Sequence, residues 1–443
     1  MDTAKAFKAY DIRGIFPDEI DQELAYRLGR AFVALDQMRT VLVARDMRAS
    51  SEPLSTAFMS GAMEQGADVV DLGLASTDLL YYASGVKGLP GVVFTASHNP
   101  AEYNGIKLCR AGAVPVGQDT GLGDLRALVD SNLFPEPARL GRLTNEDLLS
   151  SYAEHLLGQV DADDIGSLKI VVDAANGMGG LTVPAVLGRL DLEIVPMFFE
   201  LDGTFPNHPA DPIQPENLAA LQAKVVEVEA ACGLAFDGDA DRVFFVDEKG
   251  ETVNASLLGA MVAEAILRKN PGEKVVYSLT CSRVVPETIE RAGGTPIRTR
   301  VGHSFIKQVM ADTGAIFGTE HSGHFYFRDH FRADCGMLAA LHALAVIGRA
   351  GSFSEALAPY RTTWHSGEIN STVTDAQAAI EEISRVYSDA KQDRTDGLTV
   401  EYEDWWFSLR ASNTEPLLRL NLEHSDPEEG PKRRDEVLSI IRS

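Results

Sequence analysis

Three stretches of the chain repeat one alternation of apolar and polar positions. Each begins with a short β-branched strand, continues through a helical pattern and ends in a second apolar strand. The opening strands are predicted at 41–44, 169–172 and 274–277. The second strands, each reading glycine, two apolar residues and phenylalanine, are predicted at 91–94, 233–236 and 314–317. This repetition predicts three similar α/β units.

Polar loops follow the three second strands directly. They read Thr-Ala-Ser-His-Asn-Pro at 95–100, Asp-Gly-Asp-Ala-Asp-Arg at 237–242 and Gly-Thr-Glu-His-Ser-Gly-His at 318–324. In open α/β sheets, ligands bind beyond the carboxyl ends of the strands. We therefore expect the three loops to converge on one cleft.

The last part of the chain has a different pattern. After Ser352 the sequence predicts strands at 368–374 and 400–409, helices at 375–388 and 431–442, and a polar loop at 410–416. Helices are also expected at 145–159, before the second unit, and at 255–269, at the start of the third. The tail therefore reads as an α+β domain that brings a fourth loop to the cleft.

The length of 443 residues agrees with this division, because it exceeds what one hydrophobic core organises. We expect an α/β fold with three similar domains and a C-terminal α+β domain around a central cleft. The domain boundaries are predicted at 1–155, 156–254, 255–365 and 366–443.

The formal net charge of −25 restricts the partners. Such a surface repels nucleic acids and anionic membranes, so neither is expected to bind. No apolar run reaches about 18 residues, and the first residues lack an apolar signal segment. The cysteines form no C-x-x-C pair, which favours reduced thiols and a cytoplasmic protein; they are Cys109, Cys232, Cys281 and Cys335.

The loop at 237–242 carries three carboxylates, Asp237, Asp239 and Asp241. Carboxylates so close together repel one another unless a hard divalent cation joins them, and oxygen-only ligands suit Mg²⁺. A solvated turn is the alternative. An EF-hand is excluded, because Arg242 stands where that loop needs glycine.

The loop at 95–100 presents Ser97 before an Asn-Pro turn. A serine hydroxyl is a weak nucleophile unless its surroundings activate it, so Ser97 alone could belong to an ordinary turn. Beside a three-aspartate metal loop it reads as a phosphoryl carrier whose oxygen completes the Mg²⁺ sphere. His98 is expected to orient it.

The remaining loops suit a phosphorylated sugar. Glu320, Ser322 and His324 can hydrogen-bond hydroxyl groups, although His321 and His324 leave a zinc site as the alternative. In the tail, a guanidinium, hydroxyls and an amide form a phosphate cradle in composition, with a plain β-turn as the alternative; the residues are Arg410, Ser412, Asn413 and Thr414.

An anionic sugar phosphate needs a local positive field against the global charge. Tyr10 and Arg13 stand at a glycine turn near the N-terminus, and Lys107 follows the serine loop. With Arg242, His303 and Arg410 these residues are expected to supply that field.

Together the motifs carry a resemblance. Tyr-Asp-Ile-Arg-Gly at 10–14, the three loops above and Arg-Ala-Ser-Asn-Thr-Glu-Pro at 410–416 occur in the order and spacing of the α-D-phosphohexomutase superfamily. The sequence resembles that family over essentially its whole length, and its sugar and phosphate loops are most similar to those of the bacterial phosphomannomutase and phosphomannomutase/phosphoglucomutase members. The resemblance implies three domains with mixed four-stranded sheets and a fourth domain of TATA-binding-protein-like fold.

The resemblance also implies residue roles. Ser97 would be the phosphoserine and, with Asp237, Asp239 and Asp241, would bind Mg²⁺. The sugar hydroxyls would be held by Glu320, Ser322 and His324. The non-reacting phosphate would be held by Arg410, Ser412, Asn413 and Thr414. The reacting end would be lined by Arg13, Lys107, Arg242 and His303, with Lys107 or His303 as the proton-transfer group. Tyr10 would contact the substrate.

The implied activity is interconversion of mannose 6-phosphate and mannose 1-phosphate through a hexose 1,6-bisphosphate, which would also be the activator. Phosphoglucomutase and phosphoglucosamine mutase stay open, as do an aspartate-nucleophile phosphatase using Asp237 and a non-catalytic sugar-phosphate sensor. Thr280 stands where some relatives have lysine, so a contact made by that lysine is missing here. A monomer or homodimer is expected.

Overall fold

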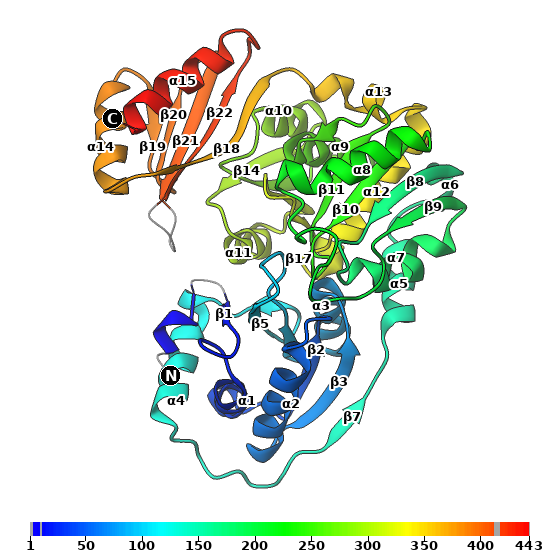
Figure 1. Ribbon diagram of the computed structural model, residues 1–443, viewed down its shortest axis with the longest axis vertical. Coiled ribbons are helices and arrows are strands. Elements are labelled where there is room, and N and C mark those ends of the chain that lie inside the picture. The colour runs from blue at the N-terminus through cyan, green and yellow to red at the C-terminus, as the bar shows by residue number, and fades with distance from the viewer. Residues whose placement is uncertain (1–2, 9–10, 412–416, 443) are drawn as a thin grey trace.

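The computed structural model describes residues 3–8, 11–411 and 417–442, and Figure 1 labels their elements. These residues form four β-sheets, with the first domain (blue to cyan) at the bottom of the view and the last (orange to red) at the upper left. The predicted fold class, three α/β domains with mixed sheets and an α+β domain, is confirmed. The boundaries predicted at 155, 254 and 365 stay predictions.

Each of the first three sheets is built on the same four strands, three parallel and one antiparallel. Their spatial orders are β3-β2-β4-β5, β9-β8-β10-β11 and β14-β13-β15-β16. The strands are β2 (Thr40–Arg45), β3 (Asp68–Leu74), β4 (Gly91–Phe94), β5 (Tyr103–Arg110), β8 (Leu168–Asp173), β9 (Leu192–Met197), β10 (Cys232–Phe236), β11 (Val243–Asp247), β13 (Lys274–Ser278), β14 (Thr295–Thr299), β15 (Phe317–Thr319) and β16 (Phe325–Phe327). The internal repeat predicted from the sequence is therefore confirmed in the topology.

Further strands extend this shared centre. β1 (Ile12–Ile15) and β6 (Val114–Pro115) pair with β5, and β7 (Leu143–Asn145) pairs with β3. β12 (Thr252–Val253) extends the second sheet, and β17 (Ala333–Asp334) extends the third. Within the described residues the sheets have seven, five and five strands, rather than the four that the resemblance implied.

Helices pack on these sheets, and their ends follow local capping rules. Asp21 begins α1 by accepting a hydrogen bond from Leu24 N (2.8 Å), and Gln37 ends it in a left-handed conformation with φ of 50°. The helices of the first three domains are α1 (Gln22–Asp36), α2 (Ser51–Glu64), α3 (Thr77–Lys87), α4 (Leu122–Ser131), α5 (Leu149–Leu157), α6 (Ala162–Ile165), α7 (Gly179–Val186), α8 (Pro215–Glu227), α9 (Ala255–Lys269), α10 (Val284–Arg291), α11 (His303–Thr313), α12 (Gly336–Ala350) and α13 (Phe353–Leu357).

Helix α12 unites the first three domains. Its side chains are buried on nearly every face, as expected for a helix inside a core. One continuous apolar cluster joins it to Tyr152 on α5, Leu234 on β10 and Leu80 on α3. Among the described residues, no single helix is long and apolar enough to cross a membrane, although the bent pair Gly336–Ala350 and Phe353–Tyr360 together meet that criterion.

Several predicted elements differ from the structure; the strand predicted at 368–374, for example, is Trp364–Thr372. The strand predicted at 314–317 begins only at Phe317, because Gly314 ends α11 in a left-handed conformation with φ of 71°. The strand predicted at 400–409 is a hairpin of two strands, because a turn follows Glu401. The helix predicted at 145–159 begins at Leu149, since Asn145 still belongs to β7.

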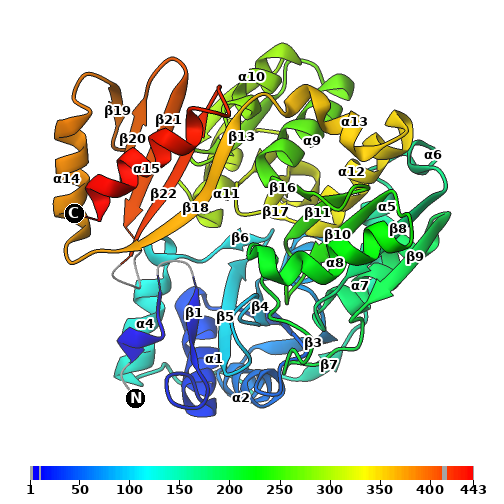
Figure 2. The same ribbon diagram turned by 45° about the horizontal axis from the view of Figure 1, so that its top comes forward.

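The fourth domain, at the upper left of Figure 2, has an antiparallel sheet whose strands contact two helices. The spatial order is β18-β22-β21-β20-β19, and α14 contacts α15. The elements are β18 (Trp364–Thr372), α14 (Ala376–Val386), β19 (Lys391–Asp393), β20 (Leu398–Glu401), β21 (Trp405–Ala411), β22 (Leu417–His424) and α15 (Gly430–Ile441). Its apolar cluster, which includes Phe407 and Leu420, is separate from the cluster around α12.

Polar contacts join the fourth domain to the third. The Arg283 guanidinium, just before α10, donates to the main-chain carbonyls of Tyr402, Glu403 (2.7 Å) and Trp405 (3.2 Å). In return, the buried Glu423 carboxylate accepts from Ser282 Oγ (3.0 Å) and from Arg283 N (3.1 Å). These bonds orient the fourth domain relative to the third.

Candidate active site

Ser97 lies where β4 ends and meets the acidic loop that follows β10. Both strands are fully buried, so each loop starts where the chain leaves the core. Ser97 has a left-handed backbone with φ of 49°, and its N–H donates to Thr95 Oγ1 (2.9 Å). Its Oγ donates to Asp237 Oδ2 (2.5 Å) and lies 3.2 Å from His98 Nδ1. The predicted convergence of the serine and acidic loops is therefore present.

Asp237, Asp239 and Asp241 form a buried carboxylate cluster. All three are 0% exposed, and one ligand oxygen from each lies within 4.8 Å of the others. Burial, together with the charges of Asp239 and Asp241, raises the pKa of Asp237 to about 7 despite the opposing effect of Arg242. Adjacent carboxylates are therefore difficult to ionise together without a cation.

The donor set fits a divalent cation. Asp239 Oδ1 and Asp241 Oδ1 are buried and accept no hydrogen bond from the described residues. Oxygen ligands of this type suit a hard cation such as Mg²⁺. Thr77 Oγ1 donates to Asp239 Oδ2 (2.6 Å), so the other oxygen of that carboxylate is held in place from α3.

Cationic side chains surround the cluster. Lys107 Nζ lies 2.7 Å from both Asp239 Oδ2 and Asp241 Oδ2. Although burial opposes it, the attraction of these carboxylates holds the pKa of Lys107 well above its ordinary value. Arg242 Nε donates to Asp237 Oδ2 (3.0 Å), and Arg242 Nη2 lies 3.4 Å from Ser97 Oγ.

The two histidines near the cluster have opposite protonation tendencies. Burial and the Lys307 ammonium lower the pKa of His303 to about 3. Burial also opposes protonation of His324, but Asp241 and Asp334 raise its pKa overall. His324 Nδ1 lies 3.1 Å from Asp334 Oδ2. At neutral pH His303 is therefore an uncharged imidazole, whereas His324 is biased toward the imidazolium.

One cavity of about 620 Å³ is lined by residues of all four domains, including Ser97 and, of the three aspartates, Asp241. Of the predicted site residues it contains Arg13, Ser97, Lys107, Asp241, Arg242, His303 and His324. Its described lining has five lysines and arginines but four aspartates and glutamates, whereas the whole chain has 40 and 65. The lining is therefore less acidic than the chain as a whole, and the expected local positive field stays a prediction.

Other predicted residues lie elsewhere. Glu320 is 2% exposed; its Oε1 accepts from Gly302 N (3.0 Å) and its Oε2 from Tyr326 OH (2.6 Å). Arg410 Nε pairs with Asp396 Oδ2 (3.2 Å), and neither Arg410 nor Ser322 is among the described residues lining the cavity. Four predicted residues lie outside the described residues: Tyr10, Ser412, Asn413 and Thr414.

Arg419 was missed by the sequence analysis. It lies on β22 of the fourth domain and lines the cavity beside residues of the first three domains. Its alternating strand gives no motif, so only the folded arrangement identifies it.

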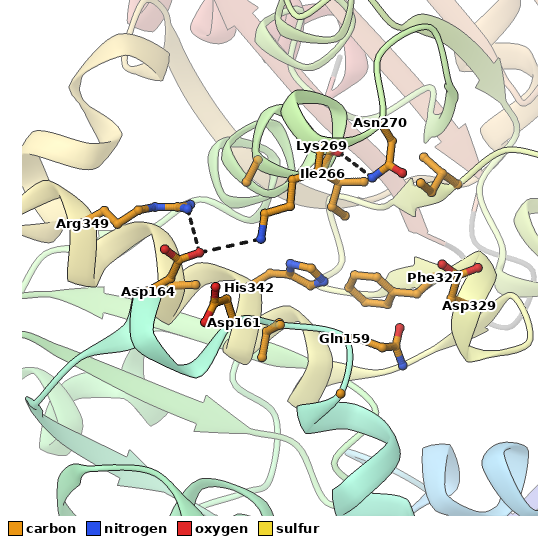
Figure 3. A pocket seen from close by; sticks show the side chains of 15 residues that line it. Gln159, Asp161, Asp164, Ile266, Lys269, Asn270, Phe327, Asp329, His342 and Arg349 are labelled. Atoms are coloured by element: carbon orange, nitrogen blue, oxygen red, sulfur yellow. Dashed lines mark hydrogen bonds and ion pairs between the residues drawn. The ribbon is translucent and has the colours of Figure 1, made fainter.

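A second, smaller cavity of about 320 Å³ lies between α6, α9 and α12 (Figure 3). Asp164 Oδ2 accepts from Arg349 (2.9 Å) and lies 3.7 Å from Lys269 Nζ, while the rings of His342 and Phe327 stack 5.4 Å apart. None of the predicted site residues that the structure describes lines it. The candidate active site is therefore the larger cavity.

The close fit of the serine and acidic loops leads to a testable prediction. A Cβ at Gly238 would lie 2.3 Å from the carbonyl oxygen of Ser97, so Gly238→Ala must displace one loop. Because displacement of about 1 Å can reduce a rate by about 100-fold, we expect a kcat loss of that order in steady-state assays. Gly123→Ala on α4, where nothing lies within 4 Å of the new Cβ, is the matched control and should retain parental activity. Parental kcat in Gly238→Ala would contradict the geometry.

Comparison with known proteins places this geometry in a family. Four descriptions match in order: phosphoglucomutase/phosphomannomutase alpha/beta/alpha domain I at 4–132, domain II at 150–250, domain III at 254–362 and the C-terminal domain at 368–440. A phosphomannomutase of Salmonella montevideo is 38% identical across 100% of both chains. The chain belongs to the phosphoglucomutase/phosphomannomutase family.

Other members of the phosphoglucomutase/phosphomannomutase family are similar to this chain over nearly its whole length. The phosphohexose mutases of Xanthomonas campestris pv. campestris are 40% identical over 99% of this chain and 100% of theirs. A crystal structure of a family member from Burkholderia thailandensis, 31% identical, matches with a TM-score of 0.92 over 100% of this chain and 98% of that chain. The resemblance inferred from the motifs is confirmed, and the protein is an isomerase-type intramolecular phosphotransferase.

Proposed function

We propose that this enzyme is a phosphomannomutase that interconverts mannose 6-phosphate and mannose 1-phosphate through phospho-Ser97 and a hexose 1,6-bisphosphate. The observation that carries the proposal is the contact of Ser97 Oγ with Asp237 Oδ2 (2.5 Å), which joins the predicted phosphoryl carrier to the carboxylate cluster. The full-length relatives named phosphomannomutase support the sugar assignment.

Asp237, Asp239 and Asp241, with an oxygen of phospho-Ser97, would hold Mg²⁺. Such an ion supplies positive charge that stabilises the transferring phosphoryl group. Asp239 Oδ1 and Asp241 Oδ1 are buried and accept no hydrogen bond from the described residues, which supports this assignment.

The transfer itself uses groups of this chain. The oxygen of a sugar hydroxyl forms a bond to phosphorus while the bond between phosphorus and Ser97 Oγ breaks, and the hydroxyl proton leaves. Arg242 lies 3.4 Å from Ser97 Oγ and can stabilise the oxygen as it departs. Return of the other phosphate to Ser97 reverses these changes and completes the isomerisation.

Two predicted groups would handle the proton. Lys107 stays protonated between Asp239 and Asp241, so it suits charge stabilisation and donation. Burial and the Lys307 ammonium keep His303 neutral, so its imidazole could accept the hydroxyl proton, although only as a weak base.

The intermediate must reorient, because either end of the bisphosphate has to reach Ser97. Arg13, Arg242 and Arg419 line the cavity and can receive phosphate at the reacting end. Glu320, Ser322 and His324 would hold the sugar hydroxyls. The other phosphate would be held by the tail loop, namely Arg410, Ser412, Asn413 and Thr414, and Tyr10 would contact the substrate from the N-terminal turn.

Initial rates on mannose 1-phosphate, glucose 1-phosphate and glucosamine 1-phosphate, each with a hexose 1,6-bisphosphate activator, test the sugar assignment. We expect the highest kcat/KM with mannose 1-phosphate. A higher value with glucose 1-phosphate would establish phosphoglucomutase, and one with glucosamine 1-phosphate would establish phosphoglucosamine mutase. A monomer or homodimer and a cytoplasmic location stay predictions.

Glu320→Gln tests the sugar loop. Loss of a carboxylate hydrogen-bond acceptor costs about 1.5–3 kcal/mol, which is about 10–150-fold in kcat/KM. We expect a loss in this range on the preferred sugar, measured by steady-state kinetics. Glu287→Gln on the exposed face of α10 is the control and should match the parent. A parental kcat/KM in Glu320→Gln would remove Glu320 from the site.

A further inference from the structure

Arg48, in the turn between β2 and α2, lies beneath the serine loop. Its guanidinium donates to four main-chain carbonyls of that loop and the residues that follow it. The distances are 2.9 Å to Ser97 O, 2.6 Å to Asn99 O, 2.7 Å to Pro100 O and 3.0 Å to Tyr103 O. One side chain thus fixes the path of the backbone on both sides of the Asn-Pro turn.

The Arg48 side chain is fully buried and ion-paired. Its exposed fraction is 0%, and its Nε lies 3.2 Å from Asp46 Oδ2, whose side chain is also 0% exposed. Burial lowers the pKa of Arg48 and raises that of Asp46. A buried ion pair is a poor source of stability compared with an apolar pair of equal volume. The position that this ion pair gives to the Arg48 side chain therefore explains its presence better than a contribution to the stability of the protein does.

The Asp46 carboxylate fixes the base of this arrangement. Asp46 Oδ1 accepts from Arg48 N (3.0 Å) and from Ser51 Oγ (2.5 Å), at the start of α2. Arg48 is consequently anchored to the rigid end of β2 and to α2 before it reaches the serine loop. A planar guanidinium with several donors suits this task, whereas an ammonium has fewer directions available.

Residues of the second domain pack against Arg48. The ring of Phe205 lies 4.9 Å from the centre of the guanidinium, and a Cβ at Gly203 would lie 2.5 Å from Arg48 Cα. The same domain supplies the acidic loop that meets Ser97. Arg48 is therefore placed at the junction where the phosphoryl carrier must be aligned with its carboxylate partners.

The Ser97 backbone explains why alignment is needed. A left-handed φ of 49° is unfavourable for a serine unless neighbouring groups hold it. Arg48 Nη2 holds the Ser97 carbonyl, and Gly238 leaves room for that carbonyl on its other side. With the carbonyl fixed, Ser97 Oγ points toward Asp237.

We propose that Arg48 is a positioning residue for phosphoryl transfer, acting through the main chain of the serine loop. The inference rests on the proposed role of Ser97 as the phosphoryl carrier. Arg48 is not among the described residues that line the cavity, so its loss should reduce the rate of transfer and leave substrate affinity unchanged.

The test measures phosphorylation of Ser97 directly. Dephosphorylated enzyme is mixed with glucose 1,6-bisphosphate and Mg²⁺, and intact mass follows the added phosphoryl group with time. Arg48→Met keeps the length of the side chain but removes every donor, so we expect labelling to slow by about 100-fold. Arg48→Lys should label about tenfold faster than Arg48→Met. Affinity for the hexose phosphate, from calorimetry, should stay within about twofold of the parent in both variants.

Arg45→Met is the matched control. Arg45 is the last residue of β2 and is partly buried, but its ion pair is with Asp71 (3.7 Å). This variant should label at the parental rate. Labelling of Arg48→Met within threefold of the parent, or a loss of hexose phosphate affinity equal to the loss of rate, would overturn the inference.

If Arg48→Met does not fold, labelling of Arg48→Lys tests the positioning role instead. We expect this variant to label about tenfold more slowly than the parent, with faster amide hydrogen exchange confined to the peptide that covers 95–105. Parental labelling in Arg48→Lys would overturn the inference. Absence of any label on Ser97 in the parent would instead overturn the proposed function, and the positioning role with it.

Discussion

Ser97→Ala is expected to reduce mutase turnover by about 10⁴-fold or more, since loss of a catalytic nucleophile has effects of that order. Without Oγ there is no atom to accept or release the phosphoryl group. Alanine keeps the fold of the loop, because the main-chain bonds to Thr95 and Arg48 do not use the hydroxyl. A coupled assay measures the turnover, and intact mass should show no phosphorylation after incubation with the bisphosphate.

The same experiment separates the mutase from the phosphatase that uses Asp237. Ser60→Ala, in which only a hydroxyl bonded to Thr56 O (2.9 Å) is lost, is the control and should keep full activity. Full mutase activity in Ser97→Ala would refute the central proposal. A phosphoryl group trapped on Asp237 would instead identify an aspartate nucleophile.

The motifs predicted the centre of the site because each functional loop directly follows a strand of the repeated pattern. Ser97 and Asp237 are 140 positions apart, yet equivalent positions after β4 and β10 bring them into contact. Arg48 could not be predicted in this way, because its role depends on the carbonyls that the folded loop turns toward it. Arg419 could not be predicted as a cavity residue for a similar reason, because it lines the cavity only through the placement of the fourth domain.

The wrong strand predictions have physical causes as well. The segment 314–317 has the same sequence pattern as the other second strands. Gly314, however, ends α11, so only Phe317 of this segment belongs to the sheet. In the tail, the apolar run from Val400 to Leu409 contains the polar residues Glu403 and Asp404 at a hairpin. The local amino-acid sequence does not distinguish a continuous strand from two paired strands.

Domain contacts also bear on the reaction. The apolar cluster around α12 joins the first three domains, whereas Arg283 and Glu423 join the fourth through hydrogen bonds. A polar junction rearranges more readily than a shared core. If the proposed bisphosphate intermediate reorients, the fourth domain, which brings Arg419, would therefore be the part that moves most readily.

Removal of divalent cations is the second large effect expected. Three buried carboxylates, Asp237, Asp239 and Asp241, receive hydrogen bonds from Lys107 and Arg242 in the described part of the chain. The formal charge of this group is negative by one, and a phosphorylated Ser97 would make it more negative. We expect a chelator to reduce turnover by about 1,000-fold or more, because charge stabilisation supplies most of the catalysis of phosphoryl transfer. Added Mg²⁺ should restore it in the coupled assay.

Metal binding should also be visible without turnover. A ligand present at about 100 times its Kd stabilises the folded state by about 2.7 kcal/mol, so Mg²⁺ should raise the unfolding temperature of the parent. Asp241→Asn removes one ligand and brings the formal charge of the group to zero. The metal-free form of this variant should therefore be at least as stable as the metal-free parent. Mg²⁺ should no longer raise its unfolding temperature. Asp163→Asn, on the short exposed turn α6, should respond to Mg²⁺ as the parent does. An unchanged Mg²⁺ response in Asp241→Asn would mean that the ion binds somewhere other than the carboxylates beside Ser97.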